Sequence, residues 1–248
     1  EKTDGSWLWN QVPKSVIDSV IQEAIGKETL PSLFERVDKL CNGKPVDMII
    51  GGPPCQAYSV AGRARLGKKI EEDPRNDLYK FYVEFLKRYK PKMFVFENVL
   101  GIFTAKGGEP FRDLIRLVRE LDYNIDFREQ IASQHGVLQK RHRVIIVGWQ
   151  NKRDTQEDTS YHYPYLLEEQ MPYKMMRDLF CDLPIVKAGE GTLCGIVHYT
   201  KPLSDMEYLK KSGIRGVLSF TTQHIARPNN PTDREIYKQA VEQWNEGK

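Results

Sequence analysis

The sequence predicts an α/β fold: a doubly wound, Rossmann-like sheet of parallel strands, followed by part of a smaller, irregular domain. Two observations support this prediction. Between residues 46 and 149, short apolar runs alternate with amphipathic segments of helical period, which is the order that builds parallel sheets. After Trp149 the alternation stops, and short apolar runs mix with Gly and Pro. We therefore expect one large domain at residues 1–150, and a linker with the beginning of a second domain at residues 151–248.

Helices are predicted where apolar residues recur every three or four positions. This spacing occurs in residues 13–25, 32–40 and 110–121. The clearest helix precedes Pro91, and its apolar stripe contains Leu78, Phe81, Tyr82, Phe85, Leu86 and Tyr89. Full burial stabilises each such side chain by about 1.5–3 kcal/mol, so we expect this stripe to lie in the core.

Strands are predicted at the apolar runs between these helices. They span Val46–Ile50, Met93–Phe96, Tyr123–Ala132 and Val144–Trp149. The first run is short and bounded by turn residues, which is typical of a buried strand. A long polar stretch, Gln56 to Asp77, separates it from the next helix. Loops of this length inside a compact domain are usually functional lids or disordered segments.

Composition excludes several classes of protein. Hydrophobic residues make up 40% and charged residues 29%, as in ordinary globular proteins, and no apolar run approaches the roughly 18 residues that span a bilayer. A cytosolic protein is therefore the default expectation. The 4 cysteines show neither metal-ligand spacing nor a dense disulfide pattern, which favours reduced thiols. A net charge of +3 permits a nucleic-acid partner without requiring one.

Reactive groups fall at the ends of the predicted strands. Cys55 follows the first strand, Glu97 follows the second, and the basic cluster at residues 140–143 precedes the last. Taken singly, a free cysteine is usually a small buried hydrophobe, and an acid or a basic cluster is usually a surface ion-pair partner. Together at one rim of a sheet, a thiol, a carboxylic acid and arginines suit covalent attack on an electron-poor ring, with acid assistance and stabilisation of negative charge.

The order and spacing of these motifs resemble those of DNA cytosine-5 methyltransferases of the bacterial restriction-modification type. Pro54-Cys55-Gln56 resembles the nucleophile motif, and residues 73–79 resemble the element after the catalytic loop. Glu97-Asn98-Val99 resembles the acid motif, and Gln139, Arg141 and Arg143 occupy the family's Gln-x-Arg-x-Arg pattern. The match covers residues 47–148.

The resemblance implies a methyltransferase sheet that binds S-adenosylmethionine and acts on double-stranded DNA. The catalytic residues would be Cys55, which attacks C6 of a flipped-out cytosine, Glu97, which holds the exocyclic amine and N3, and Arg141, which donates to O2. Attack at C6 makes C5 nucleophilic enough to accept a methyl group. Pro54 and Leu78 match family positions that line the cofactor pocket.

The resemblance also implies a set of DNA-binding residues. Those at the loop that closes over the flipped base are Gln56, Ser59, Arg63 and Arg75. Gln139 and Arg143 would support Arg141 and the neighbouring loops. Residues 177–184 resemble the bridge into the target-recognition domain, where His224 and Arg227 are candidates for contacts to base edges or phosphates. A structural histidine and a surface arginine are the alternative reading of those two residues.

Two motifs of the family are absent from this sequence: the glycine-rich cofactor loop and the carboxyl-terminal Asn-containing motif. Asp38 is a further acidic candidate for the adenine side of the cofactor pocket. We expect either an incomplete sequence or a complementary chain that carries the missing motifs, and otherwise a monomer in the bacterial cytoplasm. The alternative functions are a tRNA cytosine-5 methyltransferase of the same fold and an inactive DNA-binding subunit.

Overall fold

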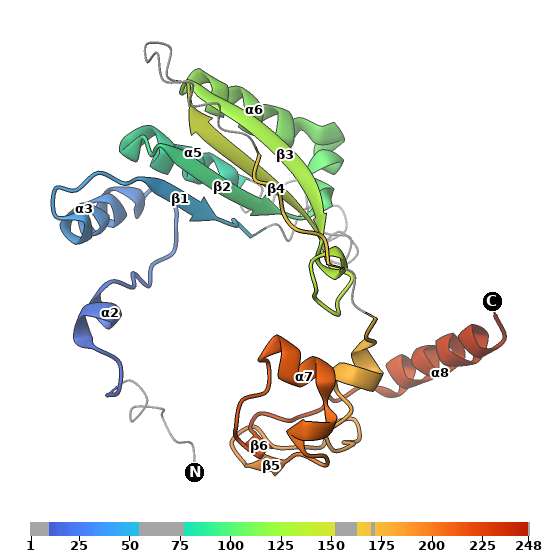
Figure 1. The fold of residues 1–248 in the computed structure, drawn as a ribbon. Coiled ribbons are helices and arrows are strands. Elements are labelled where there is room, and N and C mark those ends of the chain that lie inside the picture. Colours follow the sequence, from blue (N-terminus) through green and yellow to red (C-terminus); the bar gives the residue numbers. More distant parts are fainter. Residues whose placement is uncertain (1–9, 55–76, 152–162, 170–171, 248) are drawn as a thin grey trace. The chain divides into compact units, whose positions relative to one another are not determined.

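The structure, a computed structural model, describes residues 10–54, 77–151, 163–169 and 172–247 (Figure 1). The chain divides into two compact units, residues 1–135 with 140–168, and residues 136–139 with 169–248. Within the described ranges, no helix has both the length and the apolar character needed to cross a membrane.

A four-stranded mixed sheet organises the first unit, with the strand order β1-β2-β4-β3. The strands are β1 (Met48–Gly51), β2 (Met93–Asn98), β3 (Tyr123–Ile131) and β4 (His142–Gln150). β1 runs parallel to β2, whereas β4 runs antiparallel to both β2 and β3. The α/β class expected from the sequence is confirmed, and the prediction that all strands run parallel is wrong.

The reversed direction of β4 follows from the connections between the strands. Helix α5 (Leu78–Tyr89) separates β1 from β2, and helix α6 (Glu109–Glu120) separates β2 from β3, so β1, β2 and β3 run in the same direction. Between β3 and β4 the chain forms a short 3-10 turn, Ala132–Gln134, and a loop, without a crossover helix. β4 therefore returns antiparallel between β2 and β3 (Figure 1).

The apolar core forms where α5 and α6 pack against one face of this sheet. Phe94 and Phe96 of β2 and Val144 and Ile146 of β4 are at most 1% exposed, and their spacing of two places each pair on one face. Of the stripe predicted on α5, two members are buried and the others are half-buried. The helical side chains of the core include Tyr82, Leu86, Leu114 and Val118.

The amino-terminal part of the first unit differs most from the sequence-based expectation. Helix α3 (Leu30–Cys41) confirms the predicted second helix, but the first helix forms only as α2 (Lys14–Asp18). Val16 and Val20 are 52% and 68% exposed, so the apolar stripe lacks the packing that usually stabilises a helix. Where α2 ends, the Ser19 hydroxyl donates to the Val16 carbonyl at 2.6 Å.

Strand β1 is also more exposed than predicted. Met48 and Ile50 are 45% and 73% exposed, although the run was expected to form a buried strand. The reason is that β1 pairs with β2 along one edge, and in the described part of the chain no strand pairs with its other edge. An apolar strand with a free edge is the kind of surface to which further polypeptide adds.

The second unit is irregular and contains a two-stranded antiparallel sheet of β5 (Val197–His198) and β6 (Phe220–Thr221). Its helices are α7 (Glu207–Ser212) and α8 (Pro231–Asn245), and a π-helical turn spans Met175–Leu179. The side chains of Tyr208 and Leu209 on α7 are each 3% exposed.

A buried ion pair joins three segments of the second unit. Arg215 Nη1 lies 2.6 Å from Asp182 Oδ2, and their side chains are 7% and 2% exposed. The same nitrogen donates to the Lys201 carbonyl at 3.0 Å, and the guanidinium lies 3.9 Å from the centre of the Tyr199 ring. These contacts connect residue 182, the chain after β5 and the loop before β6.

Candidate active site and cofactor pocket

The described part of the candidate active site is centred on Glu97, near the carboxyl end of β2. Glu97 is paired with Ile145 of the antiparallel strand β4. Arg143 lies two residues before Ile145 in β4, so the period of two directs its side chain to the face that carries Glu97. Arg141 directly precedes β4. Arg143 Nε lies 2.6 Å from Glu97 Oε1, and Arg141 Nη2 lies 3.9 Å from the same oxygen.

The two arginines differ in exposure. The Arg143 side chain is 22% exposed and also donates from Nη1 to the His142 carbonyl at 2.7 Å, whereas the Arg141 side chain is 52% exposed. Arg143 is therefore the arginine that fixes the Glu97 carboxylate. Arg141 keeps most of its donors available to a molecule bound beside Glu97.

The residue after Glu97 is buried, and the turn after β1 packs closely against the Glu97 carboxylate. Asn98 is 4% exposed, and its side-chain oxygen accepts a hydrogen bond from the Val99 amide at 2.8 Å. In the turn directly after β1, a Cβ added to Gly52 would lie 2.9 Å from Glu97 Oε2. A side chain at position 52 would therefore require the Glu97 carboxylate to shift from its place beside Arg143. The residues that lead into the Pro54-Cys55 motif therefore lie against the acid.

An apolar cavity of about 550 Å³ opens at the carboxyl end of β1. It is lined by Ile25, Ile49, Ile50, Gly51, Gly52, Pro53, Pro54, Leu78, Phe81, Tyr82 and Phe85. Its volume is within the range of small-molecule and cofactor sites. Pro54 and Leu78, which the sequence predicts to be cofactor-binding residues, line this same cavity. The cavity is continuous with the turn that meets Glu97, because Gly52 belongs to both.

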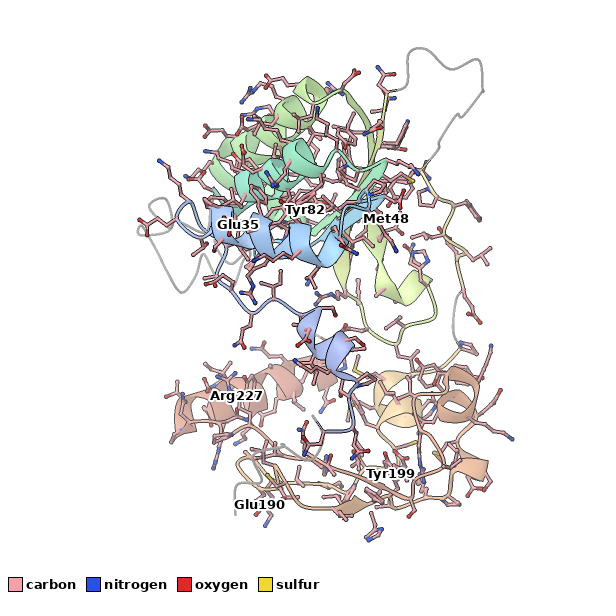
Figure 2. The ribbon with its side chains drawn as sticks, turned by 90° about the vertical axis from the view of Figure 1, so that its left-hand side faces the viewer. Glu35, Met48, Tyr82, Glu190, Tyr199 and Arg227 are labelled. Carbon is pink, nitrogen blue, oxygen red and sulfur yellow. The ribbon has the colours of Figure 1, made fainter. Side chains whose placement is uncertain are left out.

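Tyr82 forms the floor of this cavity and joins two strands. Its hydroxyl donates to the carbonyls of Ile49 and Val95, at 3.2 and 3.0 Å, and a Cβ on Gly51 would lie 2.7 Å from its ring. Burial raises the pKa of the Tyr82 hydroxyl well above its usual range, so the group remains a hydrogen-bond donor. Figure 2 labels Tyr82 of α5 and Met48 of β1.

The other predicted site residues fall into two groups. Cys55, Gln56, Ser59, Arg63 and Arg75 lie outside the described residues, and their roles stay predictions. The second group belongs to the second unit. Gln139 and Arg227 are both exposed, and the backbone amide of Gln139 donates to the Val137 carbonyl at 2.8 Å. His224 Nε2 lies 2.8 Å from the Pro184 carbonyl.

Asp38 lies on α3 and pairs with α5. Its carboxylate accepts hydrogen bonds from the Arg88 guanidinium and, at 3.0 Å, from the Tyr89 hydroxyl. The Arg88 hydrogen bond holds the pKa of Asp38 below its usual range. Arg88 also lies 4.8 Å from the centre of the Phe34 ring. In the described structure Asp38 thus connects two helices.

Sequence reasoning did not identify three contributors to the site. From the sequence, Gly52 was predicted only to lie in a turn, and Asn98 only to belong to the acid motif. Phe81 was predicted to lie in the core with the rest of the α5 stripe. The helical spacing of that stripe carries the signal for the cavity wall, because an apolar stripe with six members over 12 residues extends past the face that the sheet covers. The need for glycine at position 52 depends on a contact with a distant strand, which local sequence does not report.

Comparisons with known proteins show the family to which the chain belongs. The family described as C-5 cytosine-specific DNA methylase matches residues 32–248. The Type II methyltransferase M.Bpa9945I of Bacillus paralicheniformis is 34% identical over 219 residues, which cover 82% of this chain and 47% of the relative. M1.HphI of Haemophilus parahaemolyticus, also a Type II methyltransferase, is 34% identical over 189 residues, covering 75% of this chain and 48% of the relative.

Among solved structures, a protein described as a DNA modification methyltransferase encoded within an E. coli prophage superimposes with a TM-score of 0.51 at 25% identity. The superposition covers 73% of this chain and 47% of that one. The chain thus spans about half the length of the relatives that it matches. On the family match and the 34% identity together, the chain belongs to the C-5 cytosine-specific DNA methylase family.

Proposed function

We propose that this chain carries the cytosine-activating half of a Type II, restriction-modification DNA methyltransferase, which transfers a methyl group to C5 of a flipped-out cytosine through a covalent cysteine adduct. The observation that carries the proposal is the cluster of Glu97, Arg143 and Arg141 against the Gly52 turn that leads to Cys55. A carboxylic acid fixed by arginine, next to a nucleophile, is the set of groups that addition to a pyrimidine ring requires.

The proposed reaction proceeds as follows. The Cys55 thiolate forms a bond to C6, and the electron pair of the C5–C6 double bond becomes available at C5. A free thiol with a pKa of about 8.5 is only a few per cent ionised at pH 7, so attack needs an activated ring. Glu97 holds the exocyclic amine and N3, and Arg141 donates to O2, where negative charge develops. The C5 electron pair would then form a bond to the methyl group, whose bond to the donor sulfur breaks. Loss of the C5 proton to solvent would finally expel the Cys55 thiolate and restore the C5–C6 double bond.

Bound S-adenosylmethionine would supply the methyl group as an electrophile. The cavity beside Gly52 fits part of such a cofactor, since Pro54, Leu78 and Phe81 offer an apolar wall next to the reacting base. None of the described residues that line this cavity carries a charge. The polar ends of the cofactor therefore require partners from other parts of the protein.

We propose that further polypeptide, in the same protein or in a complementary chain, completes this pocket. Support comes from β1, whose outer edge is unpaired in the described structure and whose Ile50 is 73% exposed at the cavity wall. A strand added there would satisfy the edge and enclose the cavity. A monomer is the alternative if the same chain supplies that strand.

Double-stranded DNA is the proposed substrate, and the bacterial cytoplasm the proposed location. Flipping the target base out of a duplex costs a few kcal/mol, which protein contacts must offset. Gln56, Ser59, Arg63 and Arg75 are the proposed contacts of the closing loop. The proposed role of Arg143 is to hold Glu97 in place. Gln139 and Arg227 are proposed to contact the DNA backbone.

Trapping of the covalent adduct tests this function. The intact protein is incubated with S-adenosylmethionine and duplex DNA that contains 5-fluorocytosine, whose fluorine replaces the proton that must leave. We expect a protein–DNA adduct that survives denaturing electrophoresis, disappears in Cys55→Ser and persists in the matched control Cys194→Ser, an exposed cysteine of the second unit. Absence of an adduct with the intact protein contradicts the proposal, and an adduct with tRNA alone favours the tRNA enzyme.

A further inference from the structure

The segment around His224 belongs to a longer paired ribbon. We define the recognition ribbon as residues 189–198 together with residues 219–227. β5 and β6 form one end of it, and an isolated bridge between Gly191 and Ile225 forms the other. Hydrogen bonds from Thr192 N to the His224 carbonyl, at 2.9 Å, and from Ala226 N to the Glu190 carbonyl, at 2.8 Å, continue the pairing. Figure 2 labels Glu190 and Arg227 on this ribbon.

The ribbon contains a large bulge. Between the paired positions 191↔225 and 197↔221, residues 192–196 on one strand lie opposite residues 222–224 on the other. A hydrogen bond within the bulge holds its shape: Thr192 Oγ1 accepts from the Gly195 amide at 2.7 Å. Bulges redirect the side chains of the strands that contain them and occur next to functional sites.

Two neighbouring residues opposite this bulge are held differently. His224 Nε2 donates to the Pro184 carbonyl at 2.8 Å, which ties the ribbon to the segment that follows Asp182. Gln223 is exposed, and its φ of 58° is in the left-handed region, which non-glycine residues seldom adopt. The backbone of Gly191 packs directly against the backbone of His224, next to Gln223. A Cβ added to Gly191 would lie only 2.2 Å from the His224 carbonyl oxygen, so this close packing has no room for a side chain.

We propose that Gln223 is a specificity-determining residue that reads a base edge in the major groove, and that His224 is a positioning residue for it. This inference rests on the proposed action on duplex DNA. A two-stranded ribbon fits the major groove, and the glutamine amide offers one donor and one acceptor, the pattern that complements N6 and N7 of adenine. The anchored ring of His224 fixes the backbone from which the exposed amide of Gln223 projects.

Selection from a randomised duplex pool tests this proposal by binding alone. The intact protein and its variants are used to enrich duplexes whose bases are randomised, and the bound fraction is sequenced. We expect the wild type to enrich adenine at one position, and Gln223→Ala and Gln223→Gly to reduce that preference about 10-fold at this position only. Gln223→Glu should move the preference from adenine to cytosine, since a carboxylate accepts from cytosine N4.

Matched control variants separate base recognition by Gln223 from a nonspecific effect of the substitution. Gln243 is an exposed glutamine on α8, so Gln243→Ala and Gln243→Glu should keep the wild-type profile. Gln223→Gly relieves the left-handed backbone, so loss of preference in this variant reports the side chain and not strain. His224→Ala should weaken the preference at the Gln223 position while the other positions keep theirs.

The outcomes are distinguishable from those of the proposed function. An unchanged base preference in all three Gln223 variants overturns this inference, as does a wild type that enriches no sequence. Methylation of the same pool, measured by bisulfite sequencing after addition of S-adenosylmethionine, is a separate arm. A pool that stays unmethylated contradicts the proposed function, while the binding profiles still decide the role of Gln223.

Discussion

The two units of this chain hold their candidate functional side chains in place by different means. In the first, Glu97 lies on a strand whose alternate residues Phe94 and Phe96 are at most 1% exposed, and sheet register brings Arg143 to it. In the second, short irregular segments are joined by the Asp182–Arg215 ion pair and by the His224–Pro184 hydrogen bond. The comparison teaches that the candidate site of the first unit lies on an apolar core, which sets the strand register that brings Arg143 to Glu97. The candidate recognition segment of the second unit is instead held by polar contacts between loops.

Disruption of the buried ion pair should have the largest effect, confined to the second unit. Asp182→Leu leaves the Arg215 guanidinium buried without its partner, which should lower the free energy of unfolding of that unit by about 3–5 kcal/mol. Hydrogen exchange of the amides of each unit measures this effect.

A double variant sharpens the comparison. Asp182→Leu with Arg215→Met removes both charges and should recover most of the stability lost in the single variant. If the single variant exchanges no faster than the wild type, or if the loss appears equally in both units, polar contacts do not distinguish the second unit from the first.

A methyl group at Gly52 should disturb the first unit locally. In Gly52→Ala the new Cβ would lie 2.9 Å from Glu97 Oε2 and displace the carboxylate, so methyl transfer should slow about 100-fold while the unfolding transition changes little. Gly216→Ala is the matched control, because a Cβ there meets no atom within 4 Å. Equal rates in Gly52→Ala and the wild type would show that Glu97 does not need its observed position.

The smallest expected effect on stability concerns a hydrogen bond between helices α5 and α6 of the first unit. The Tyr79 hydroxyl donates to Asp113 at 2.7 Å and, with Arg116, lowers the pKa of Asp113 against the opposing effect of burial. Because the folded pKa is lowered, this stabilisation is present above the unfolded pKa of about 3.9 and is lost as the pH falls through the folded pKa.

Asp113→Asn should therefore reduce the free energy of unfolding by about 1 kcal/mol at pH 7. The difference from the wild type should shrink as the pH falls below about 4 and vanish only below the folded pKa of Asp113. Urea denaturation at several pH values measures it. Asp18→Asn, at an exposed pair with Lys14, is the control and should show little change at any pH. A pH-independent loss in Asp113→Asn would assign the effect to packing.

The sequence predicted the core elements because their signals are local. The α5 stripe, Leu78–Tyr89, was located from its helical spacing, and strands β2 and β4 from their apolar runs. Glu97 and Arg143, which the family resemblance proposes as site residues, lie 2.6 Å apart. The antiparallel direction of β4 was missed, since the pattern of an apolar strand is the same in either direction. The loop at 132–141, too short for a crossover helix, is the signal that could have revealed it.

Other features depend on contacts that no local pattern contains. Residues 13–25 have the period of a helix but form only α2, because their apolar face is not buried. Ile50 has the composition of a buried strand residue but lies at an edge that is unpaired in the described structure. The contact of Gly52 with Glu97 and the left-handed backbone of Gln223 both arise from pairing with distant segments.

The most direct test of the central claim, that Glu97 activates the target cytosine, is the single-turnover rate of methyl transfer by Glu97→Gln in the intact protein. The amide keeps the size of the side chain but loses the carboxylate that pairs with Arg143 and that we propose to hold N3 of the cytosine. We predict transfer at least ~100-fold slower than in the wild type, with duplex affinity unchanged. A variant that transfers methyl groups at the wild-type rate would contradict the account.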